Sequence, residues 1–263
     1  MIKFYKFHGT GNDFIMLDGR ELKTAPNADE IRHLCHRQMG IGADGLIIIK
    51  PVEGYDFEMT YFNADGSLAT MCGNGARCAV AFGFISGMSG PDVTFRAGDG
   101  GHTGKLQSLT DFKWMVEISM GDISIPEITG VSTEIHTGTP HLVIITQDPD
   151  SVNVPVEGRR IRYSEAYRIN GINVNFLSIR DNRLKVRTYE KGVEDETLSC
   201  GTGVTACAAV AALKTGINNW FVETRGGAME VKLKKNKNFF ENVRLKGPAA
   251  MVFSGELTGW IHG

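Results

Sequence analysis

A chain of 263 residues, 42% hydrophobic and 22% charged, is long enough to bury a substantial core as one large or two moderate domains. Its formal net charge of -2 argues against a nucleic-acid-binding protein that relies on neutralising phosphates. No segment approaches the roughly 20 consecutive apolar residues that a membrane-spanning helix requires, and residues 1–7 mix lysines with aromatic residues, unlike an export signal. We therefore expect a cytoplasmic protein that binds neither nucleic acid nor a membrane.

The first predicted elements are a strand and a helix. Residues 1–7 are predicted to form the strand. The helix is expected to be capped by Asp29 and to continue to about Met39. Its apolar face would consist of Ile31, Leu34 and Cys35.

Most of the remaining chain is predicted as short strands separated by Gly, Asn and Asp. A basic stretch, 232–237, is expected to be a solvated hairpin between two of them. The expected strands are residues 46–50, 57–62, 93–97, 114–119, 142–146, 174–179, 184–188, 221–224, 229–233 and 243–246.

Two further helical segments, 75–85 and 203–213, are rich in Ala and apolar on nearly every side. A helix without a polar face is buried all round. Two such helices among many strands predict an α+β fold in which mixed, mostly antiparallel sheets wrap around central helices.

The chain also matches itself at a constant offset. The segment 71–75, Met-Cys-Gly-Asn-Gly, resembles 199–203, Ser-Cys-Gly-Thr-Gly, with Cys72 and Cys200 separated by 200 − 72 = 128 residues. The same offset relates residues 8–11 to 136–139. A shared offset of about half the chain indicates a duplication into two similar domains, whose equivalent loops could face each other across a cleft.

In both halves a Cys-Gly-x-Gly loop directly precedes the buried helix. A helix N-terminus carries unpaired N–H groups and a partial positive charge, so it binds anions and stabilises a thiolate. Two facing copies would place two thiols around one clamped carboxylate. This arrangement suits proton removal at the carbon next to a carboxylate, with one thiolate as base and the opposing thiol as acid.

The chain has five cysteines, and this odd number argues against a disulfide framework. No two of them form a Cys-x-x-Cys pair, which argues against a structural zinc site. Small buried thiols usually just fill space. We expect that packing role for Cys35, Cys78 and Cys207, and a chemical role for Cys72 and Cys200.

Four motifs are similar to those of the diaminopimelate epimerases, and the similarity covers essentially the whole chain. They are residues 11–14 (Gly-Asn-Asp-Phe), 71–78 (Met-Cys-Gly-Asn-Gly-Ala-Arg-Cys), 171–176 (Gly-Ile-Asn-Val-Asn-Phe) and 199–203. The resemblance implies two pseudo-symmetric domains, 1–118 together with 249–263 and 119–248, with the active site in the cleft between them. It implies interconversion of LL- and meso-diaminopimelate, for lysine and peptidoglycan precursor synthesis, by a homodimer that uses neither pyridoxal phosphate nor a metal.

The resemblance also implies roles for individual residues. Cys72 and Cys200 would be the acid/base pair, and His141 and Glu190 would lie beside them and help to set their protonation. Without the resemblance, His141 could merely cap a strand, and Glu190 could belong to a surface turn. Residues implied to bind the substrate are Asn12, Asn63, Asn173, Glu190 and Lys191, with backbone N–H groups of Gly73, Asn74, Gly201 and Thr202 holding the reacting carboxylate.

Three positions depart from the family's pattern. Gly45 stands where Gln is frequent, Thr139 where Asn is frequent, and Lys191 where Arg usually follows the glutamate. Lysine offers a point charge where arginine offers a rigid two-pronged fork. These departures concern the distal half of the pocket, so Gly45 and Thr139 are the least secure of the substrate-binding positions.

Three other functions remain open from the sequence. The first is racemisation or epimerisation of a different amino acid on the same scaffold. The second is a thiol redox protein that cycles a disulfide between Cys72 and Cys200. The third is a non-catalytic anion-binding module, which would need the helix ends but not both cysteines.

Overall fold

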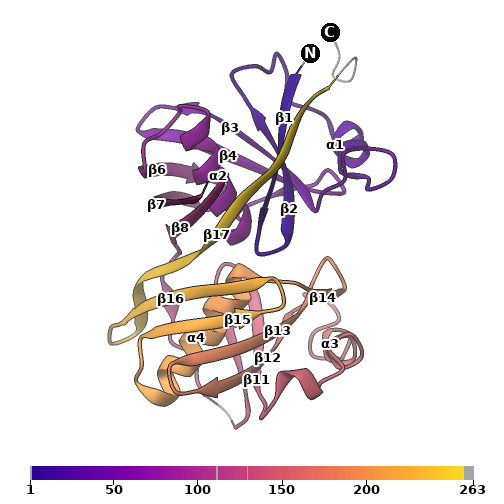
Figure 1. Cartoon of the computed structure of the whole chain (residues 1–263). Coiled ribbons are helices and arrows are strands. Elements are labelled where there is room, and N and C mark those ends of the chain that lie inside the picture. The colour runs from indigo at the N-terminus through magenta and orange to yellow at the C-terminus, as the bar shows by residue number, and fades with distance from the viewer. Residues whose placement is uncertain (1, 111, 129, 258–263) are drawn as a thin grey trace. The chain divides into compact units, whose positions relative to one another are not determined.

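The computed structural model describes residues 2–110, 112–128 and 130–257 (Figure 1). The chain forms two compact units. Unit 1 comprises Met1–Ile118 together with Gly247–Gly263, and unit 2 comprises Ser119–Lys246. Among the described residues, no helix combines the length and the hydropathy that crossing a bilayer would require. The fold is rich in strands and contains few helices.

Unit 1 is built on a ladder of strands that closes on itself. The pairs follow the order β1–β2, β2–β3, β3–β4, β4–β6, β6–β7 and β7–β8. The pairs β2–β3 and β4–β6 are parallel, and the other four are antiparallel. The last strand, β17 (Phe239–Leu257), pairs with both ends of this ladder, β1 and β8. The other strands are β1 (Ile2–Gly9), β2 (Asn12–Asp18), β3 (Gly45–Val52), β4 (Tyr55–Asn63), β5 (Leu68–Ala69), β6 (Asp92–Ala97), β7 (Gly100–Thr110) and β8 (Lys113–Ser119).

Helix α2 (Gly73–Ile85) is the buried helix of unit 1. Its first eleven residues, 73–83, are all buried, and the helix packs against β1, β2, β3, β4 and β7. Phe82 lies with its ring 6.0 Å from that of Phe7 and 4.9 Å from that of Tyr5. A helix of small and apolar residues suits this position because no side has to remain in water.

Helix α1 (Ala28–Cys35) corrects one prediction. Its cap is Asn27, whose side chain accepts hydrogen bonds from the backbone N–H groups of Asp29 and Glu30 at 3.0 Å. The Glu30 carboxylate accepts one in return from the Asn27 N–H, which completes a capping box. The helix ends at Cys35 and does not reach Met39. The predicted apolar face of Ile31, Leu34 and Cys35 is confirmed as buried.

Unit 2 contains the same succession of strand pairings. The pairs follow the order β10–β11, β11–β12, β12–β13, β13–β15, β15–β16 and β16–β17. As in unit 1, the second and fourth pairs, β11–β12 and β13–β15, are parallel, and the other four are antiparallel. The pair Lys185↔Glu223 lies 128 residues after the pair Phe57↔Phe95. The strands are β9 (Ile123–Ser124), β10 (Ser132–His136), β11 (Pro140–Ile145), β12 (Asn173–Arg180), β13 (Arg183–Glu190), β14 (Asp195–Thr197), β15 (Asn219–Thr224) and β16 (Gly227–Lys235).

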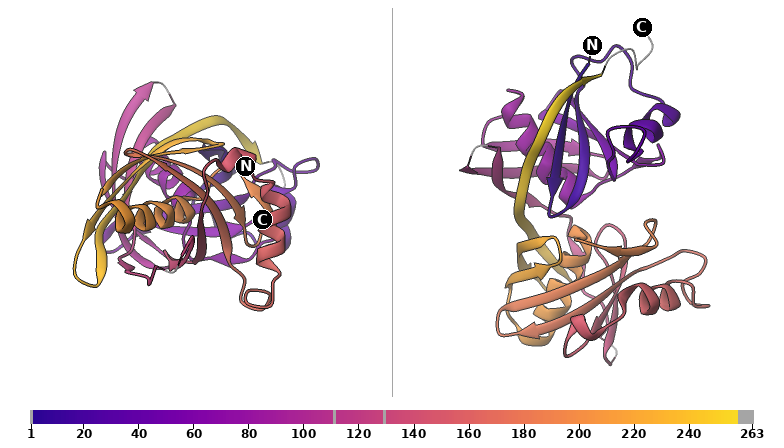
Figure 2. Two further views of the ribbon diagram at one scale, coloured as in Figure 1. Left: turned by 90° about the horizontal axis from the view of Figure 1, so that it is seen from below. Right: turned by 45° about the vertical axis from the view of Figure 1, so that its right-hand side comes forward.

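Helix α4 (Gly201–Thr215) is the counterpart of α2 in unit 2. It is buried except for Thr202 from its first residue to Ala212, and it packs against β10, β11, β12, β13, β15 and β16 (Figure 2, orange). It ends at Gly216, which adopts a φ of 78° that glycine tolerates without strain. Two shorter helices, η1 (Pro149–Ser151) and α3 (Val154–Arg162), complete the unit.

The predicted basic hairpin is confirmed. Strands β16 and β17 are joined by residues 236–238, and the Asn236 N–H donates to the carbonyl of Phe239 at 2.8 Å. Lys234 forms an ion pair with Glu241 at 2.7 Å. Residues 234–238 are exposed, and Lys234 supports the pairing of the two strands.

Candidate functional site

Each unit presents a cysteine at the start of its buried helix. Cys72 is the N-cap of α2, with φ −135° and ψ 120°, and Cys200 is the N-cap of α4, with φ −119° and ψ 112°. Their carbonyls accept the first helical hydrogen bonds, from Ala76 at 2.7 Å and from Val204 at 2.9 Å. Neither side chain forms a capping hydrogen bond with its helix.

The N-termini of these two helices have the electrostatic character of anion sites. Neither α2 nor α4 has an acidic residue in its first turn. The positive end of each helix dipole is therefore not neutralised by a nearby protein carboxylate of that turn. Backbone N–H groups that lack a helical partner are then suited to a carboxylate or a thiolate.

Asn12 links the strand β2 to the thiol of unit 1. Its amide oxygen accepts hydrogen bonds from the Cys72 sulfur at 3.6 Å and from the Asn74 amide at 3.4 Å. Its amide nitrogen donates to the carboxylate of Asp44 at 2.7 Å. Because a carboxylate only accepts, Asp44 fixes which end of the Asn12 amide faces Cys72.

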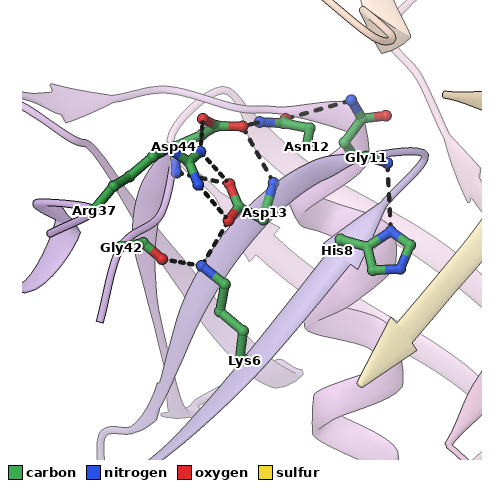
Figure 3. Close-up of polar contacts among 9 residues, drawn as sticks. Lys6, His8, Gly11, Asn12, Asp13, Arg37, Gly42 and Asp44 are labelled. Carbon is green, nitrogen blue, oxygen red and sulfur yellow. Dashed lines mark hydrogen bonds and ion pairs between the residues drawn. The ribbon is translucent and has the colours of Figure 1, made fainter. Parts of the chain in front are cut away.

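A charged cluster holds Asp44 in place (Figure 3). The Arg37 guanidinium binds both oxygens of Asp13, at 2.8 and 3.1 Å, and also Asp44 at 2.7 Å. The Lys6 ammonium pairs with Asp13 at 2.7 Å and donates to the carbonyl of Gly42. Although burial opposes it, hydrogen bonding from Arg37 and Lys6 lowers the pKa of Asp13 to about 2. Asp13 is therefore ionised at neutral pH.

Arg77 places a fully buried cation behind the first turn of α2. Its guanidinium donates to Asn74 at 2.9 Å, Thr10 at 3.1 Å and the carbonyl of Gly73 at 3.2 Å. A longer bond, 3.4 Å, reaches the carbonyl of Pro248. Among the described residues, none of these acceptors is a carboxylate. Burial lowers the pKa of Arg77 to about 10, so the group still carries its charge at neutral pH.

Gly45 and Asn63 lie opposite each other in the β3–β4 pair. A side chain at Gly45 would meet the carbonyl oxygen of Phe62 at 2.5 Å and the ring of Tyr61 at 2.6 Å. The room that a longer side chain would need is thus occupied by Tyr61, which the sequence analysis did not single out. The Asn63 amide donates to the hydroxyl of Ser67 at 3.0 Å.

His141 connects to Cys200 through a threonine. It lies inside β11, fully buried, and its Nε2 is 3.0 Å from the hydroxyl of Thr202. That hydroxyl is 3.3 Å from the sulfur of Cys200. Burial, reinforced by the charge of His136, lowers the pKa of His141 to about 3. His141 is thus a neutral member of this site and does not merely cap a strand.

Asn173 ties together three segments of unit 2. Its amide oxygen accepts from the Lys191 N–H at 2.8 Å, and its amide nitrogen donates to the carbonyl of Pro140 at 3.3 Å. Glu190 is half-buried at the end of β13, and the Lys191 ammonium donates to the carbonyl of Asn170 at 3.0 Å. Asn173 therefore aligns the segments that carry His141 and Glu190.

Thr139 lies half-buried in the bend between β10 and β11. Its carbonyl accepts from the Thr137 N–H at 3.1 Å. The Thr137 hydroxyl donates to the carbonyl of Thr202 at 3.0 Å, which anchors the bend to the first turn of α4. Thr137 was not among the predicted site residues, although it belongs to the repeated segment 136–139.

The other three cysteines are packing residues, as predicted. Cys35 is buried in α1, and its burial raises its pKa to about 12. Cys78 and Cys207 are fully buried within α2 and α4, and burial raises the pKa of each thiol well above its usual range. Inert thiols of this kind do not exchange protons near neutral pH.

Solved structures define the class of fold. A probable proline racemase from Agrobacterium radiobacter has a TM-score of 0.72 at 14% identity, covering 98% of this chain and 93% of that one. A PhzF-family phenazine biosynthesis protein from Bacillus anthracis has a TM-score of 0.71 at 14% identity, covering 98% and 99%. The protein therefore has the strand-rich fold that these two proteins share.

Sequence relatives define the family. The model of the family described as diaminopimelate epimerase matches residues 4–125 and 133–252. Diaminopimelate epimerase from Flavobacterium psychrophilum is 41% identical over 96% of this chain and 98% of its own, and that from Aquifex aeolicus is 39% identical over 98% of each. The chain belongs to the diaminopimelate epimerase family, and the resemblance found in its motifs is confirmed.

Proposed function

We propose that the protein interconverts LL- and meso-diaminopimelate with its own side chains, using Cys72 and Cys200 as the two acid/base groups. The observation that carries this proposal is the pair of cysteines, each at the start of a buried helix with no acidic residue in its first turn. Membership of the diaminopimelate epimerase family supports the substrate. An inversion needs a proton removed from one face and another delivered to the opposite face, which accounts for two thiols.

The proposal pairs the two units as duplicated halves, each with its strands around its buried helix, and places the substrate in a cleft between them. The reacting carboxylate would be held by backbone N–H groups of Gly73 and Asn74 from one unit and of Gly201 and Thr202 from the other. These groups begin α2 and α4, where the helix dipoles favour negative charge. Charge that develops on the carboxylate during the reaction would be stabilised in the same way.

The proton transfers balance within the thiol pair. One sulfur, as thiolate, takes the hydrogen from the α-carbon, and the electron pair of that C–H bond moves onto the carboxylate carbon and oxygens. The opposing thiol then gives its proton to the other face of the same carbon as the C–H bond re-forms. The second sulfur ends as the thiolate, so the enzyme has exchanged which cysteine is protonated.

Polar residues near the two cysteines would orient the substrate. Asn12 and Asn63 in unit 1, and Glu190 in unit 2, are assigned to its amino and carboxylate groups. Asn173 supports the segments that carry Pro140 and Lys191, through the bonds described above. We place the reaction in lysine and peptidoglycan precursor synthesis, in the cytoplasm, with the protein acting as a homodimer.

A second candidate is the epimerisation of another amino acid, and the packing at Gly45 favours considering it. The Tyr61 ring fills the space beside Gly45, so it takes up the room that the glutamine suggested by the family resemblance would need. Lys191 likewise directs its ammonium to the carbonyl of Asn170. Both features belong to the distal side of the site and leave the two thiols unchanged.

The test is to incubate the reduced protein with LL-diaminopimelate in deuterated water, without added cofactor. Incorporation of one deuterium at an α-carbon together with formation of the meso isomer is the expected result. Absence of exchange, in protein whose Cys72 and Cys200 thiols are shown by titration to be reduced, would overturn diaminopimelate as the substrate. A panel of other amino acids in the same assay then decides whether the two-thiol chemistry acts elsewhere.

A further inference from the structure

A chain of hydrogen bonds leads from the strand β12 to the sulfur of Cys200. Asn175 lies 3.1 Å from Nδ1 of His141, Nε2 of His141 lies 3.0 Å from the Thr202 hydroxyl, and that hydroxyl lies 3.3 Å from Cys200. Asn175 and His141 are completely buried. The donor and the acceptor of each of these hydrogen bonds follow from the orientation of the Asn175 amide.

The fixed end is the amide of Asn175. Its nitrogen also lies 3.2 Å from the backbone carbonyl of Leu142, which can only accept a hydrogen bond. Its oxygen accepts from the Thr188 hydroxyl at 2.9 Å. The amide nitrogen therefore faces His141, and because that nitrogen only donates, Nδ1 of His141 must be the acceptor.

The acceptor role of Nδ1 determines the tautomer of His141. A neutral imidazole carries one proton, so the proton lies on Nε2 and is donated to the Thr202 oxygen. The strongly lowered pKa of His141 excludes the doubly protonated ring near neutral pH. With one of its lone pairs occupied in this way, the Thr202 hydroxyl has its own proton available for the sulfur of Cys200.

We infer that Asn175, His141 and Thr202 form a relay that presents a hydrogen-bond donor to the Cys200 sulfur and so holds Cys200 as the resting thiolate. A thiolate is stabilised by donors, and a hydrogen bond to a charged acceptor is stronger than one between neutral groups. In the opposite tautomer, Nε2 would take the Thr202 proton, and the threonine would offer the sulfur an acceptor. Asn175 and Thr202 are therefore positioning residues that act on Cys200.

Among the described residues, unit 1 has no counterpart of this relay. Residues 128 positions earlier than Thr202 and Asn175 are Asn74 and Ile47. The Cys72 sulfur instead contacts the amide oxygen of Asn12, an acceptor whose orientation Asp44 fixes. An acceptor favours the protonated thiol. The two thiols of the proposed acid/base pair thus meet hydrogen-bond partners of opposite polarity, with Cys200 as the base in the resting enzyme.

Charged and titratable groups near the two sulfurs also affect the protonation of Cys72 and Cys200. Cys207 on α4 interacts with Cys200, and it remains a neutral thiol because of its burial. His136 on β10 acts on His141, and Glu190 ends β13, which packs against α4. In unit 1, the charge of Arg77 favours a thiolate at Cys72, and the guanidinium donates hydrogen bonds to four oxygens, those of Asn74, Thr10, Gly73 and Pro248.

The experiment measures each thiol separately, without substrate. The reduced protein is alkylated with iodoacetamide between pH 5 and 10, and the rates at Cys200 and Cys72 are read from their peptides by mass spectrometry. We expect the midpoint for Cys200 to lie at the lower pH. Thr202→Val should raise the Cys200 midpoint by about one pH unit, the effect of one charge-assisted hydrogen bond, and leave Cys72 unchanged. Thr202→Ser, which keeps the hydroxyl, should restore it.

The tautomer of His141 provides a second test. Nitrogen-15 NMR of histidine-labelled wild-type protein should show His141 with its proton on Nε2, and Asn175→Leu should populate the Nδ1–H form. A wild-type proton on Nδ1, or a Cys200 midpoint that Thr202→Val leaves unmoved, would overturn the relay. The consequence for catalysis rests on the proposed function, but both measurements omit substrate. A failed deuterium-exchange assay would therefore leave the relay standing, and the reverse also holds.

Discussion

The amide nitrogen of Asn12 donates a 2.7 Å hydrogen bond to Asp44, which leaves the amide oxygen facing the Cys72 sulfur. An asparagine side chain has two nearly isosteric ends, and only its partners decide which one faces a reacting group. Here the decision is made by a carboxylate 32 residues further along the chain, itself held by Arg37. Residues that never touch the thiol thus determine what the thiol meets.

Replacing Asp44 by asparagine tests this relationship. Asp44→Asn can donate as well as accept, so the Asn12 amide loses its fixed orientation, and we expect kcat to fall about 10- to 100-fold with a smaller change in KM. Steady-state kinetics measures both constants. Asp92→Asn is the matched control, because Asp92 is exposed and its ion pair with the exposed Lys105 is long, at 3.6 Å. Equal kinetics for the two variants would contradict the orienting role.

The two thiols of the proposed acid/base pair should each be indispensable. Cys72→Ser and Cys200→Ser keep the size of the side chain but raise the energy of the deprotonated form, so we expect epimerisation to fall by about three orders of magnitude or more. Circular dichroism should show both variants folded. Cys35→Ala is the control, since Cys35 is buried in α1 and only packs. Substantial turnover by either serine variant would refute the two-base mechanism.

Arg77 should matter through its charge. Arg77→Gln removes the charge and keeps some hydrogen bonding, whereas Arg77→Lys keeps the charge and loses the fork. If the buried cation assists the negatively charged reaction centre, the lysine variant retains more of kcat/KM than the glutamine variant. Denaturant unfolding measured alongside separates this from stability, because a neutral residue is often no worse for folding than a buried charge. Higher activity in Arg77→Gln would argue that the guanidinium only packs.

His141 makes stability depend on pH in a predictable direction. Its pKa is about 3 in the folded protein and 6.5 as its ordinary value, so the unfolded chain binds a proton first as pH falls. The stability it contributes is complete above about pH 6.5 and is lost progressively as the pH falls towards 3. Urea unfolding at pH 7 and pH 5 should show a smaller loss for His141→Gln than for the wild type, by up to ~1.4 kcal/mol per pH unit. Parallel losses in both proteins would show that His141 titrates normally when folded.

Gly45 should not accept a side chain cheaply. Gly45→Ala would press its methyl group against the Phe62 carbonyl and the Tyr61 ring, and we expect a loss of about 1–3 kcal/mol in unfolding free energy. Tyr61→Ala should recover part of that loss when combined with it, because the ring is removed while the carbonyl stays. Gly121→Ala is the control, since nothing lies within 4 Å of its added carbon. Strict additivity of the two changes would exclude the contact.

The sequence was most informative where the pattern was strong and local. Nine of the ten strands expected beyond the first helix match an observed strand to within two residues at each end, and the tenth, 243–246, is a short part of β17 (Phe239–Leu257). Helices α2 and α4 follow from segments that are apolar all round. The N-cap of the first helix was predicted wrongly because Asn27 and Asp29 are both favourable N-cap residues, and only the contacts of Glu30 distinguish them. Strand β7 was missed since glycines at positions 100, 101 and 104 hide it. Helix α3 was missed because it contains Gly158, which lies against the ring of Tyr189.

In the candidate site, too, the residues that lie in local motifs could be predicted from the sequence, and their distant partners could not. Its thiols, glycines and asparagines lie in compact motifs that the sequence displays directly. The partners that orient them come from distant segments: Arg37 and Asp44 reach Asp13 from 24 and 31 residues away, and Asn175 meets His141 across the β11–β12 pair. No local pattern marks such partners, since strand pairing and not chain spacing brings them together.

The path of β17 has a consequence for how the molecule is made. Residues 247–257 close the ladder of unit 1, so this unit is assembled from the first and the last parts of the chain. On the ribosome, the continuous unit 2 has all of its strands once residue 246 has emerged, while the earlier unit 1 still waits with an open edge. The half that is translated first is therefore the half that is completed last, and a ribosome that stops shortly before residue 247 releases a chain in which unit 1 has an exposed edge that invites aggregation.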